Sequence, residues 1–255
     1  MHLDALPALA DNYVWMLSDS DGNALVVDPG EAGPVESALS ARDLSLKAIL
    51  LTHHHADHVG AAQTLRTRHG ATVYAPRDPR IAAVDTGVGE GDRVTLEAPA
   101  AEFEVWDVSG HTLTHVAYVG AGLVFSGDTL FSLGCGRLFE GSPAQMLDSL
   151  DRLAGLPDDT RVCCGHEYTL ANAAFAHAVD PDNAALARHT DAARRAREEG
   201  RPSLPSRMQH ERAANPFLRV DAPAIMRWAD NTDTSRQGRV ARFAALRRHK
   251  DGFTA

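Results

Sequence analysis

The chain has 255 residues, of which 44% are hydrophobic and 23% are charged, and its formal net charge is −9. This composition is typical of a soluble globular protein, and the acidic balance disfavours a protein that binds nucleic acid. No apolar run reaches membrane-spanning length, and the first residues do not open a signal peptide. The three cysteines are too few and too badly spaced for a disulfide framework or a thiolate zinc site. We expect a cytoplasmic protein without a membrane partner, and a monomer.

Patterns typical of short strands dominate the first two-thirds of the chain. Apolar or alternating runs predict strands over residues 13–17, 24–27, 46–51, 72–74, 103–108, 116–119, 123–125 and 161–164. Apolar residues at helical spacing predict helices over 59–69 and 143–154. Cys163 and Cys164 fall in the last strand and are expected to be small core residues. This mixture predicts an α/β (α+β) domain over residues 1–170.

The composition changes after Tyr168. Alanine and arginine dominate, strand patterns disappear, and helices are predicted over residues 171–179, 183–199, 222–229 and 236–249. From Asn183 onward the chain has 15 Lys and Arg residues against 8 Asp and Glu residues, whereas the rest is acidic. We therefore expect a helical domain over residues 171–255. Its basic excess can bind an anionic small substrate, or it can simply balance an acidic domain.

The segment Thr52–His58 concentrates groups that bind metals, directly after a predicted strand. Its candidate ligands are three imidazoles and one carboxylate: His53, His55, Asp57 and His58. Along extended backbone, side chains alternate between the two sides, so His54 points away from the first three. The first two candidates can therefore serve one metal and the last two a neighbouring metal. The alternative is a solvated polar turn without a metal.

Three further candidate ligands each follow a strand pattern and a glycine, which lets the backbone turn sharply: His111, Asp128 and His166. Taken singly, Asp128 or His166 could be an ordinary turn residue. With the cluster they make seven ligands, and with Asp128 shared they suit a hydrolytic site of two metals roughly 3.5–4 Å apart. Zinc, iron and manganese all accept such ligands.

This ligand pattern resembles that of the metallo-β-lactamase superfamily. Within the superfamily, the chain is similar to the bacterial glyoxalase II (hydroxyacylglutathione hydrolase) family. The segments that carry the second resemblance span nearly the whole chain: Asp11–Trp15, Val27–Gly30, Gly127–Phe131, Gly134–Gly141, Cys163–Thr169, Asn215–Arg219 and Leu246–Asp251. The ligands alone specify the superfamily, whereas Cys135–Arg137 and the helical tail specify the family.

The resemblance implies an αββα metallo-β-lactamase-like sandwich followed by a small helical domain that helps to bind glutathione. The resemblance implies that one metal is bound by His53, His55 and His111. It implies that the other metal is bound by Asp57, His58 and His166, and that Asp128 binds both. The positions expected to contact the substrate are Arg137, Phe139, Tyr168, Arg247 and Lys250. Phe139 departs from the family pattern, since some members carry a tyrosine there.

The implied activity is hydrolysis of S-(2-hydroxyacyl)glutathione, chiefly S-D-lactoylglutathione, to glutathione and D-lactate in methylglyoxal detoxification. Asp57 and Asp128 would be the catalytic residues, because they help to hold two divalent metal ions that generate the attacking hydroxide. The expected metal is zinc, and iron or manganese are the alternatives. Alternatives in the superfamily are a lactonase and a persulfide dioxygenase, and the basic tail argues against both. An RNA phosphodiesterase is a further alternative, but such an enzyme is expected to have a basic surface, whereas this chain is acidic. A non-catalytic metal-binding module is the alternative of a different kind.

Overall fold

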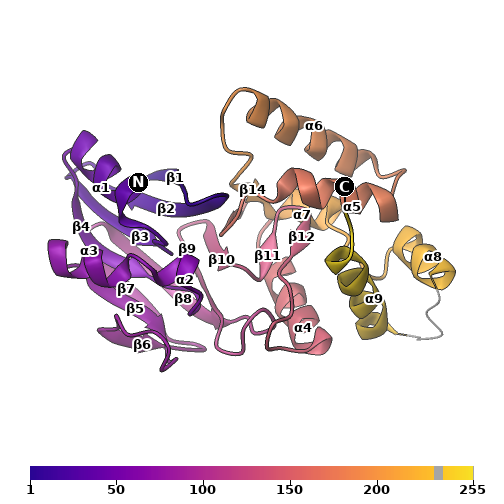
Figure 1. Ribbon diagram of the computed structural model, residues 1–255, viewed down its shortest axis with the longest axis horizontal. Coiled ribbons are helices and arrows are strands. Elements are labelled where there is room, and N and C mark those ends of the chain that lie inside the picture. Colours follow the sequence, from indigo (N-terminus) through magenta and orange to yellow (C-terminus); the bar gives the residue numbers. More distant parts are fainter. Residues whose placement is uncertain (233–237, 255) are drawn as a thin grey trace. The chain divides into compact units, whose positions relative to one another are not determined.

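The computed structural model describes residues 1–232 and 238–254 (Figure 1). This part of the chain divides into two compact units made of interleaved segments. The first unit comprises Met1–Asp107, Thr114–Gly127 and Cys163–His166, and the second comprises Val108–Leu113, Asp128–Val162 and Glu167–Ala255. The domain boundary that we place at residue 170 stays a prediction.

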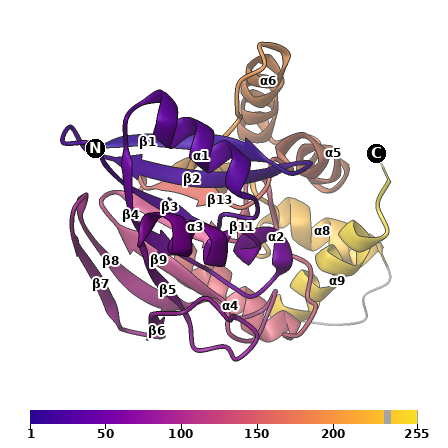
Figure 2. The ribbon, with the colours of Figure 1, turned by 60° about the vertical axis from the view of Figure 1, so that its left-hand side comes forward.

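A mixed sheet in the first unit has the strand order β1-β2-β3-β4-β5-β6. Its strands are β1 (His2–Ala8), β2 (Asn12–Ser18), β3 (Asn23–Val27), β4 (Ser45–Leu50), β5 (Thr72–Pro76) and β6 (Thr86–Val88). The pairs from β1 to β3 are antiparallel, and the pairs from β3 to β6 are parallel. Helices α1 (Ala32–Ala41) and α3 (Ala62–His69) cover one face of this sheet (Figure 2), and the short α2 (Ala56–Val59) follows β4.

Alternation along the central strands explains this packing. Val26 of β3 and Ile49 of β4 join Val35 of α1 and Leu65 of α3 in one buried apolar cluster. Leu25 is equally buried but points to the opposite face, as successive residues of a strand must. A strand that is covered on both faces has few positions for polar side chains, which is why these strands read as continuous apolar runs in the sequence.

Within the first unit, a second sheet has the strand order β13-β10-β9-β8-β7, which β13 joins through Cys163 and Cys164 because its first two residues belong to the second unit. Its strands are β7 (Arg93–Glu97), β8 (Ala100–Asp107), β9 (Val116–Gly120), β10 (Leu123–Gly127) and β13 (Arg161–Cys164). Tyr118 of β9 is fully buried and donates its hydroxyl to the carbonyl oxygen of Leu51 at 2.9 Å. This hydrogen bond ties the second sheet to the end of β4, where the candidate metal ligands follow.

Helices dominate the second unit. They are α4 (Pro143–Ala154), α5 (Thr169–Val179), α6 (Ala184–Glu198), α7 (Met208–Ala214), α8 (Pro223–Asn231) and α9 (Arg239–Asp251). Helix α4 begins with a capping box, in which Ser142 Oγ accepts from the Gln145 N–H at 3.3 Å and Gln145 Oε1 accepts from the Ser142 N–H at 2.9 Å. Pro143 at its first position costs no helical hydrogen bond.

A small hairpin of β11 (Leu130–Phe131) and β12 (Gly134–Cys135) is held against α7 by buried polar groups. Glu211 is fully buried and accepts from the main-chain N–H of Leu133 at 2.8 Å. Asn215 Nδ2 donates to the carbonyl oxygens of Phe131 at 3.1 Å and Gly134 at 3.0 Å. These bonds fix the hairpin whose end leads into Arg137, one of the predicted substrate residues.

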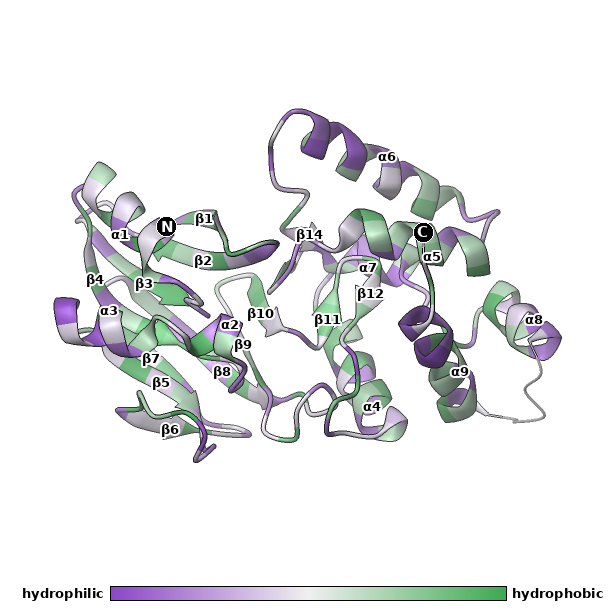
Figure 3. Ribbon diagram, viewed as in Figure 1, coloured by the Kyte–Doolittle hydropathy of each residue, from purple (hydrophilic) through white to green (hydrophobic). Residues whose placement is uncertain are grey.

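The predicted helices of the tail are present, with shifts of a few residues at their ends. The predicted start of the last helix, residues 236–237, lies outside the described residues. Two elements of the tail were not predicted: α7, and the two-residue strand β14 (Ser206–Arg207), which pairs with the start of β13. The tail is therefore not wholly helical. The sequence did not indicate β14, because two residues are too few to show a strand period. Hydrophilic and hydrophobic residues alternate around α6 and α9 (Figure 3). Among the described helices, none has both the length and the hydropathy that a membrane span requires.

Candidate metal centre and substrate cavity

Metal-binding side chains of the first unit gather where β4 ends and α2 begins. His53 and His58 are buried, and His53 Nε2 lies 3.1 Å from His55 Nδ1. Asp57 Oδ2 lies 3.4 Å from His58 Nε2 and also 3.4 Å from His166 Nε2. The ligand atoms of Asp57, His58 and His166 all lie within 4.8 Å of one another. Metal–ligand bonds of about 2 Å can span such a group.

The side-chain alternation expected for this segment extends only as far as His55. His54 points elsewhere, as predicted, and its Nδ1 lies 3.7 Å from Asp78 Oδ2. Helix α2 begins at residue 56, so Asp57 is positioned by a helical turn rather than by extended backbone. Gly30 makes room for that turn, because a Cβ there would lie 2.0 Å from the carbonyl oxygen of Asp57.

Buried acceptors orient the imidazoles. Asp28 accepts from the Thr52 N–H at 2.8 Å and from Thr52 Oγ1 at 2.7 Å, and its Oδ2 lies 3.0 Å from His58 Nδ1. Thr52 Oγ1 lies 3.0 Å from His53 Nδ1, and His115 stacks on the His53 ring with centroids 4.6 Å apart. Because the Nδ1 atoms of His53 and His58 each face an oxygen atom, their Nε2 atoms are left to bind a metal, which is the usual arrangement of histidine ligands.

Two neighbouring residues secure the other ligands of the first unit. Asp11 Oδ1 lies 2.7 Å from His166 Nδ1, and Asn12 Nδ2 donates to Asp57 Oδ2 at 3.0 Å. Hydrogen bonds from His166 and His58 hold the pKa of Asp57 well below its usual range, so this carboxylate is ionised at neutral pH. No local pattern marks Asp11, Asn12 or Asp28 as partners of the ligands, because each hydrogen bond joins segments far apart in the sequence.

The donor set of the first unit fits a divalent metal ion. Oriented imidazoles and an ionised carboxylate are ligands that zinc, iron and manganese accept. Burying this many titratable groups together would be costly without a compensating charge. The cluster is therefore a candidate metal site, as the sequence predicts, while the number and identity of the metals stay predictions.

The second unit carries the other two predicted ligands. His111 Nε2 lies 3.5 Å from Asp128 Oδ2, and His111 Nδ1 donates to the carbonyl oxygen of Arg137 at 2.9 Å. Gly136 permits this arrangement, because a Cβ there would lie 1.9 Å from the carbonyl oxygen of Asp128. Here again one imidazole nitrogen is fixed by the protein and the other faces a carboxylate.

A cavity of about 460 Å³ in the second unit brings the predicted substrate residues together. The residues that line it are His111, Asp128, Phe131, Cys135, Arg137, Phe139, Tyr168, Ala171, Asn172, Arg247, Lys250 and Phe253. Phe139 is 63% exposed, and its ring lies edge to face with His111 at 5.2 Å between centroids. All five predicted substrate residues therefore share one cavity with two predicted metal ligands, although their roles stay predictions.

Arg247 is more deeply buried than a substrate contact needs to be. It is 5% exposed, and its Nη1 donates to the carbonyl oxygen of Cys135 at 2.6 Å. Its Nη2 lies 2.9 Å from Asp251 Oδ1, and its guanidinium carbon lies 5.3 Å from the centroid of Phe217. The guanidinium thus binds the turn that precedes Arg137, and the protein itself already supplies its acceptors.

Lys250 lies one helical turn further along α9. Its Nζ donates to the carbonyl oxygen of Ala171 at 3.0 Å. Burial lowers the pKa of Lys250, and the charges of Arg247 and Arg137 lower it further. The sequence predicts that Arg247 and Lys250 share a helix face, and both do line the cavity.

The cysteines offer no nucleophile. Burial raises the pKa of Cys135 to about 11, against the opposing effect of Arg247. Its thiol is therefore neutral at physiological pH, and a neutral thiol is a poor nucleophile and metal ligand. Cys163 and Cys164 are 1% and 0% exposed, which agrees with their predicted place in the core.

Family models match both parts of the chain. Residues 10–166 match the model of the metallo-beta-lactamase superfamily, and residues 167–253 match the model described as the hydroxyacylglutathione hydrolase C-terminus. The first match covers more than half of the chain. It defines the class of protein as a metallo-β-lactamase-fold protein, which confirms the predicted α/β fold class.

The family follows from similarity along the whole chain. A protein of Xanthomonas campestris pv. campestris (strain B100) named hydroxyacylglutathione hydrolase is 52% identical over 257 residues, which cover 100% of both chains. The chain belongs to the hydroxyacylglutathione hydrolase family, as its sequence motifs predict.

Solved structures agree on the fold. ETHE1 from Myxococcus xanthus is 25% identical with a TM-score of 0.65, and the match covers 97% of this chain and 98% of that one. TTHA1623 in a di-iron-bound form is 29% identical with a TM-score of 0.55, over 65% of this chain and 92% of that one.

Proposed function

We propose that the chain hydrolyses S-(2-hydroxyacyl)glutathione thioesters, chiefly S-D-lactoylglutathione, to glutathione and D-lactate. The Xanthomonas relative carries the name of this activity, and its similarity extends over the full chain. The observation that carries the proposal is the cavity of the second unit, which is lined by His111 and Asp128 and also by the cations Arg137 and Lys250. Such a cavity suits a substrate with a reactive carbonyl at one place and carboxylates at another.

We also propose that two metal ions are held, zinc before iron or manganese. The proposed ligands of one ion are His53, His55 and His111. The proposed ligands of the other ion are Asp57, His58 and His166, and Asp128 is shared by both ions. The close spacing of Asp57, His58 and His166 and the oriented imidazoles support this set. The di-iron form of TTHA1623 supports the number two.

Bound divalent ions would lower the pKa of a water molecule to about 7 and so supply hydroxide at neutral pH. The residues of the chain do the rest. Asp28 orients the imidazole of His58, and Asp11 orients that of His166. The low pKa of Asp57 keeps its carboxylate ionised. Arg137 and Lys250 offer positive charge to the carboxylates of glutathione.

The reaction needs no dedicated acid. Water loses one proton when it is activated, its oxygen adds to the thioester carbon, and the C–S bond breaks. The carboxylic acid that forms loses the second proton to solvent, so the products are a carboxylate and a thiolate. A cysteine thiol has a pKa of about 8.5, so glutathione can leave as its thiolate and take a proton from solvent afterwards. The neutral thiol of Cys135 has no part in this scheme.

The lactonase and persulfide dioxygenase alternatives are not favoured, because the full-length relative is a named hydroxyacylglutathione hydrolase. The decisive experiment measures turnover on S-D-lactoylglutathione, on a lactone and on a phosphodiester, with metal content determined on the same sample. We expect turnover on the glutathione thioester and two metal equivalents per chain. Turnover on the lactone alone would overturn the substrate class, and active protein that never exceeds one equivalent would overturn the two-metal site.

A further inference from the structure

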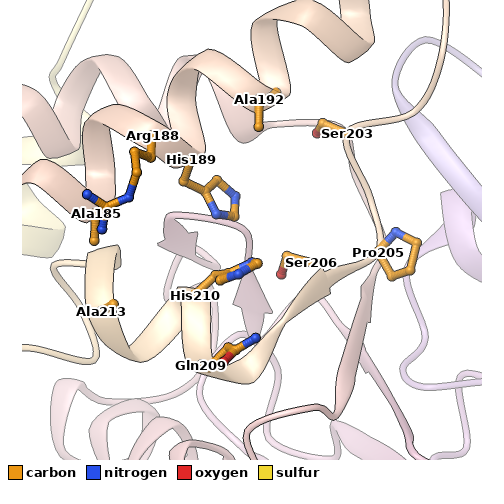
Figure 4. Close-up of a pocket in the computed structure, with 11 residues that line it drawn as sticks. Ala185, Arg188, His189, Ala192, Ser203, Pro205, Ser206, Gln209, His210 and Ala213 are labelled. Atoms are coloured by element: carbon orange, nitrogen blue, oxygen red, sulfur yellow. The ribbon is translucent and has the colours of Figure 1, made fainter.

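The second unit contains another cavity, which shares no residue with the substrate cavity. Its volume is about 560 Å³, and it lies between α6, α7 and the segment that joins them (Figure 4). The residues that line it are Ala185, Arg188, His189, Ala192, Ala193, Ser203, Pro205, Ser206, Gln209, His210 and Ala213. This volume is within the range of small-molecule sites in proteins.

The cavity exists because small side chains face each other across it. Ala185, Ala192 and Ala193 of α6 and Ala213 of α7 leave space between the helices that larger apolar residues would fill. Pro205 closes one end with a further apolar surface (Figure 4). The walls are therefore suited to the hydrocarbon part of a ligand.

One polar group of the cavity lacks a partner. Ser206 is 4% exposed, and its hydroxyl has no hydrogen-bond partner among the described residues. In Figure 4 its oxygen points toward the side of the cavity where His210 lies. A buried hydroxyl without a partner costs about 1–3 kcal/mol, so an acceptor that reaches it would remove a penalty already present in the fold.

The charge of the lining is positive. Arg188 forms no ion pair with any residue that the structure describes, and the lining contains no carboxylate side chain. His189 and His210 lie edge to face with ring centroids 5.7 Å apart. Burial lowers the pKa of His210, the neighbouring His189 and Arg207 lower it further, and Glu211 opposes them. The cation that this lining offers to an anion is therefore Arg188.

The wall formed by Ser203 is firmly held. The Ser203 N–H donates to Glu167 Oε2 at 2.8 Å, and Ser203 Oγ lies 2.7 Å from Thr169 Oγ1. A ligand therefore meets a wall that is already ordered, and binding loses less conformational entropy than it would against a loose loop.

We propose that this cavity binds a small organic carboxylate whose apolar body is about the size of an aromatic ring. Arg188 attracts the carboxylate, and the Ser206 hydroxyl and the Gln209 amide offer donors. The alanines and Pro205 pack against the apolar body. A free phosphate lacks the body, and an uncharged aromatic alcohol lacks the charge, so both should bind more weakly.

The test uses the metal-loaded full chain and benzoate as the probe, with binding followed by ligand-observed NMR. We expect Arg188→Gln to weaken benzoate binding by about tenfold, the usual effect of losing a charged hydrogen bond. Ala192→Phe should abolish binding by filling the cavity. Ser206→Ala should weaken binding without lowering the melting temperature, because its hydroxyl has no protein partner to lose.

Matched controls separate this site from others. Arg194→Gln removes a cation from the same helix that pairs with Asp191 and does not line the cavity, so it should leave binding unchanged. Lys250→Gln should also leave it unchanged, and a loss there would mean that benzoate occupies the substrate cavity. Equal binding of benzyl alcohol or inorganic phosphate would overturn the carboxylate assignment. So would the absence of benzoate binding at millimolar concentration. Thioester turnover is measured separately and does not depend on any of these outcomes.

Discussion

The metal cluster of the first unit and the substrate cavity of the second unit are built in opposite ways. Four of the five predicted ligands in the first unit come from the six residues from His53 to His58. The cavity instead draws its lining from positions between His111 and Phe253, spread over several helices, a hairpin and loops. The cluster is thus a local feature with distant supports, whereas the cavity is made entirely by tertiary packing. Mutations of the predicted metal ligands should therefore affect chemistry, and mutations of the other residues that line the cavity should affect substrate binding.

The largest effect is expected at Asp128, which we assign to both metals. Asp128→Ala should abolish turnover on S-D-lactoylglutathione and lower the metal content, because losing a shared ligand weakens both sites. The matched control is Asp148→Ala, an exposed aspartate of α4, which should change neither quantity. Retained activity in Asp128→Ala would sink the shared-ligand assignment. Metal analysis and steady-state kinetics on the same preparations provide the measurement.

Next in size is the effect of the residues that orient the imidazoles. Asp11→Ala leaves His166 Nδ1 without its carboxylate, so metal affinity should fall about 10–100-fold, as is usual for such partners. Asp11→Asn keeps an acceptor and should lose less. Competition with a chelator measures the affinity. If both variants bind metal as tightly as the wild type, Asp11 does not orient the ligand.

A smaller and divided effect is expected on α9, where the buried Arg247 and the more accessible Lys250 differ by three positions. Lys250→Met should raise KM for the glutathione thioester severalfold with kcat nearly unchanged, because a remote contact binds ground state and transition state alike. Arg247→Met should raise KM too, but it should also lower stability by about 1–3 kcal/mol, since the Cys135 carbonyl and Asp251 lose their donor.

Thermal unfolding of the two variants, beside kinetics on a small uncharged thioester, separates these roles. Neither change should affect turnover of the uncharged thioester. An Arg247→Met protein as stable as the wild type would show that this arginine serves the substrate and not the fold.

The smallest effect concerns pH. The pKa of Lys250 is lowered by burial and by Arg247 and Arg137, so its charge is lost at a lower pH than that of an ordinary lysine. KM for the glutathione thioester should therefore rise as pH rises through this lowered pKa. The effect of pH on the stability of the fold has the opposite sign. Lys250 holds its proton more tightly in the unfolded state, so the free energy of unfolding increases as pH rises from the pKa of Lys250 in the folded state to its pKa in the unfolded state.

The Lys250→Met variant should lose both pH dependences. A KM profile that is unchanged in that variant would assign the titration to another group. The measurement is KM against pH for both proteins, at constant ionic strength because exposed charges are screened by salt.

Much of the fold was predictable from the sequence, and two of the elements that were missed have clear causes. The central strands read as apolar runs because both of their faces are covered, and the helix over 143–154 has a capping box and Pro143 at its start. β1 escaped prediction because most of its residues are only partly buried, which blurs the alternation of an edge strand. β14 escaped because it has two residues and depends on its partner for its identity as a strand.

The sequence by itself predicted a ligand set, and it determined the family and the helical nature of most of the tail. Those features depend on residue types at short, regular spacings, which local backbone geometry converts directly into side-chain direction. Only the tertiary structure decided that Asp11 and Asp28 support the histidines, that Arg247 binds the Cys135 turn, and that alanines of α6 and α7 face an open cavity. Each of these depends on segments that are distant in the chain, and their meeting is set by the packing of the whole unit, which no local pattern encodes.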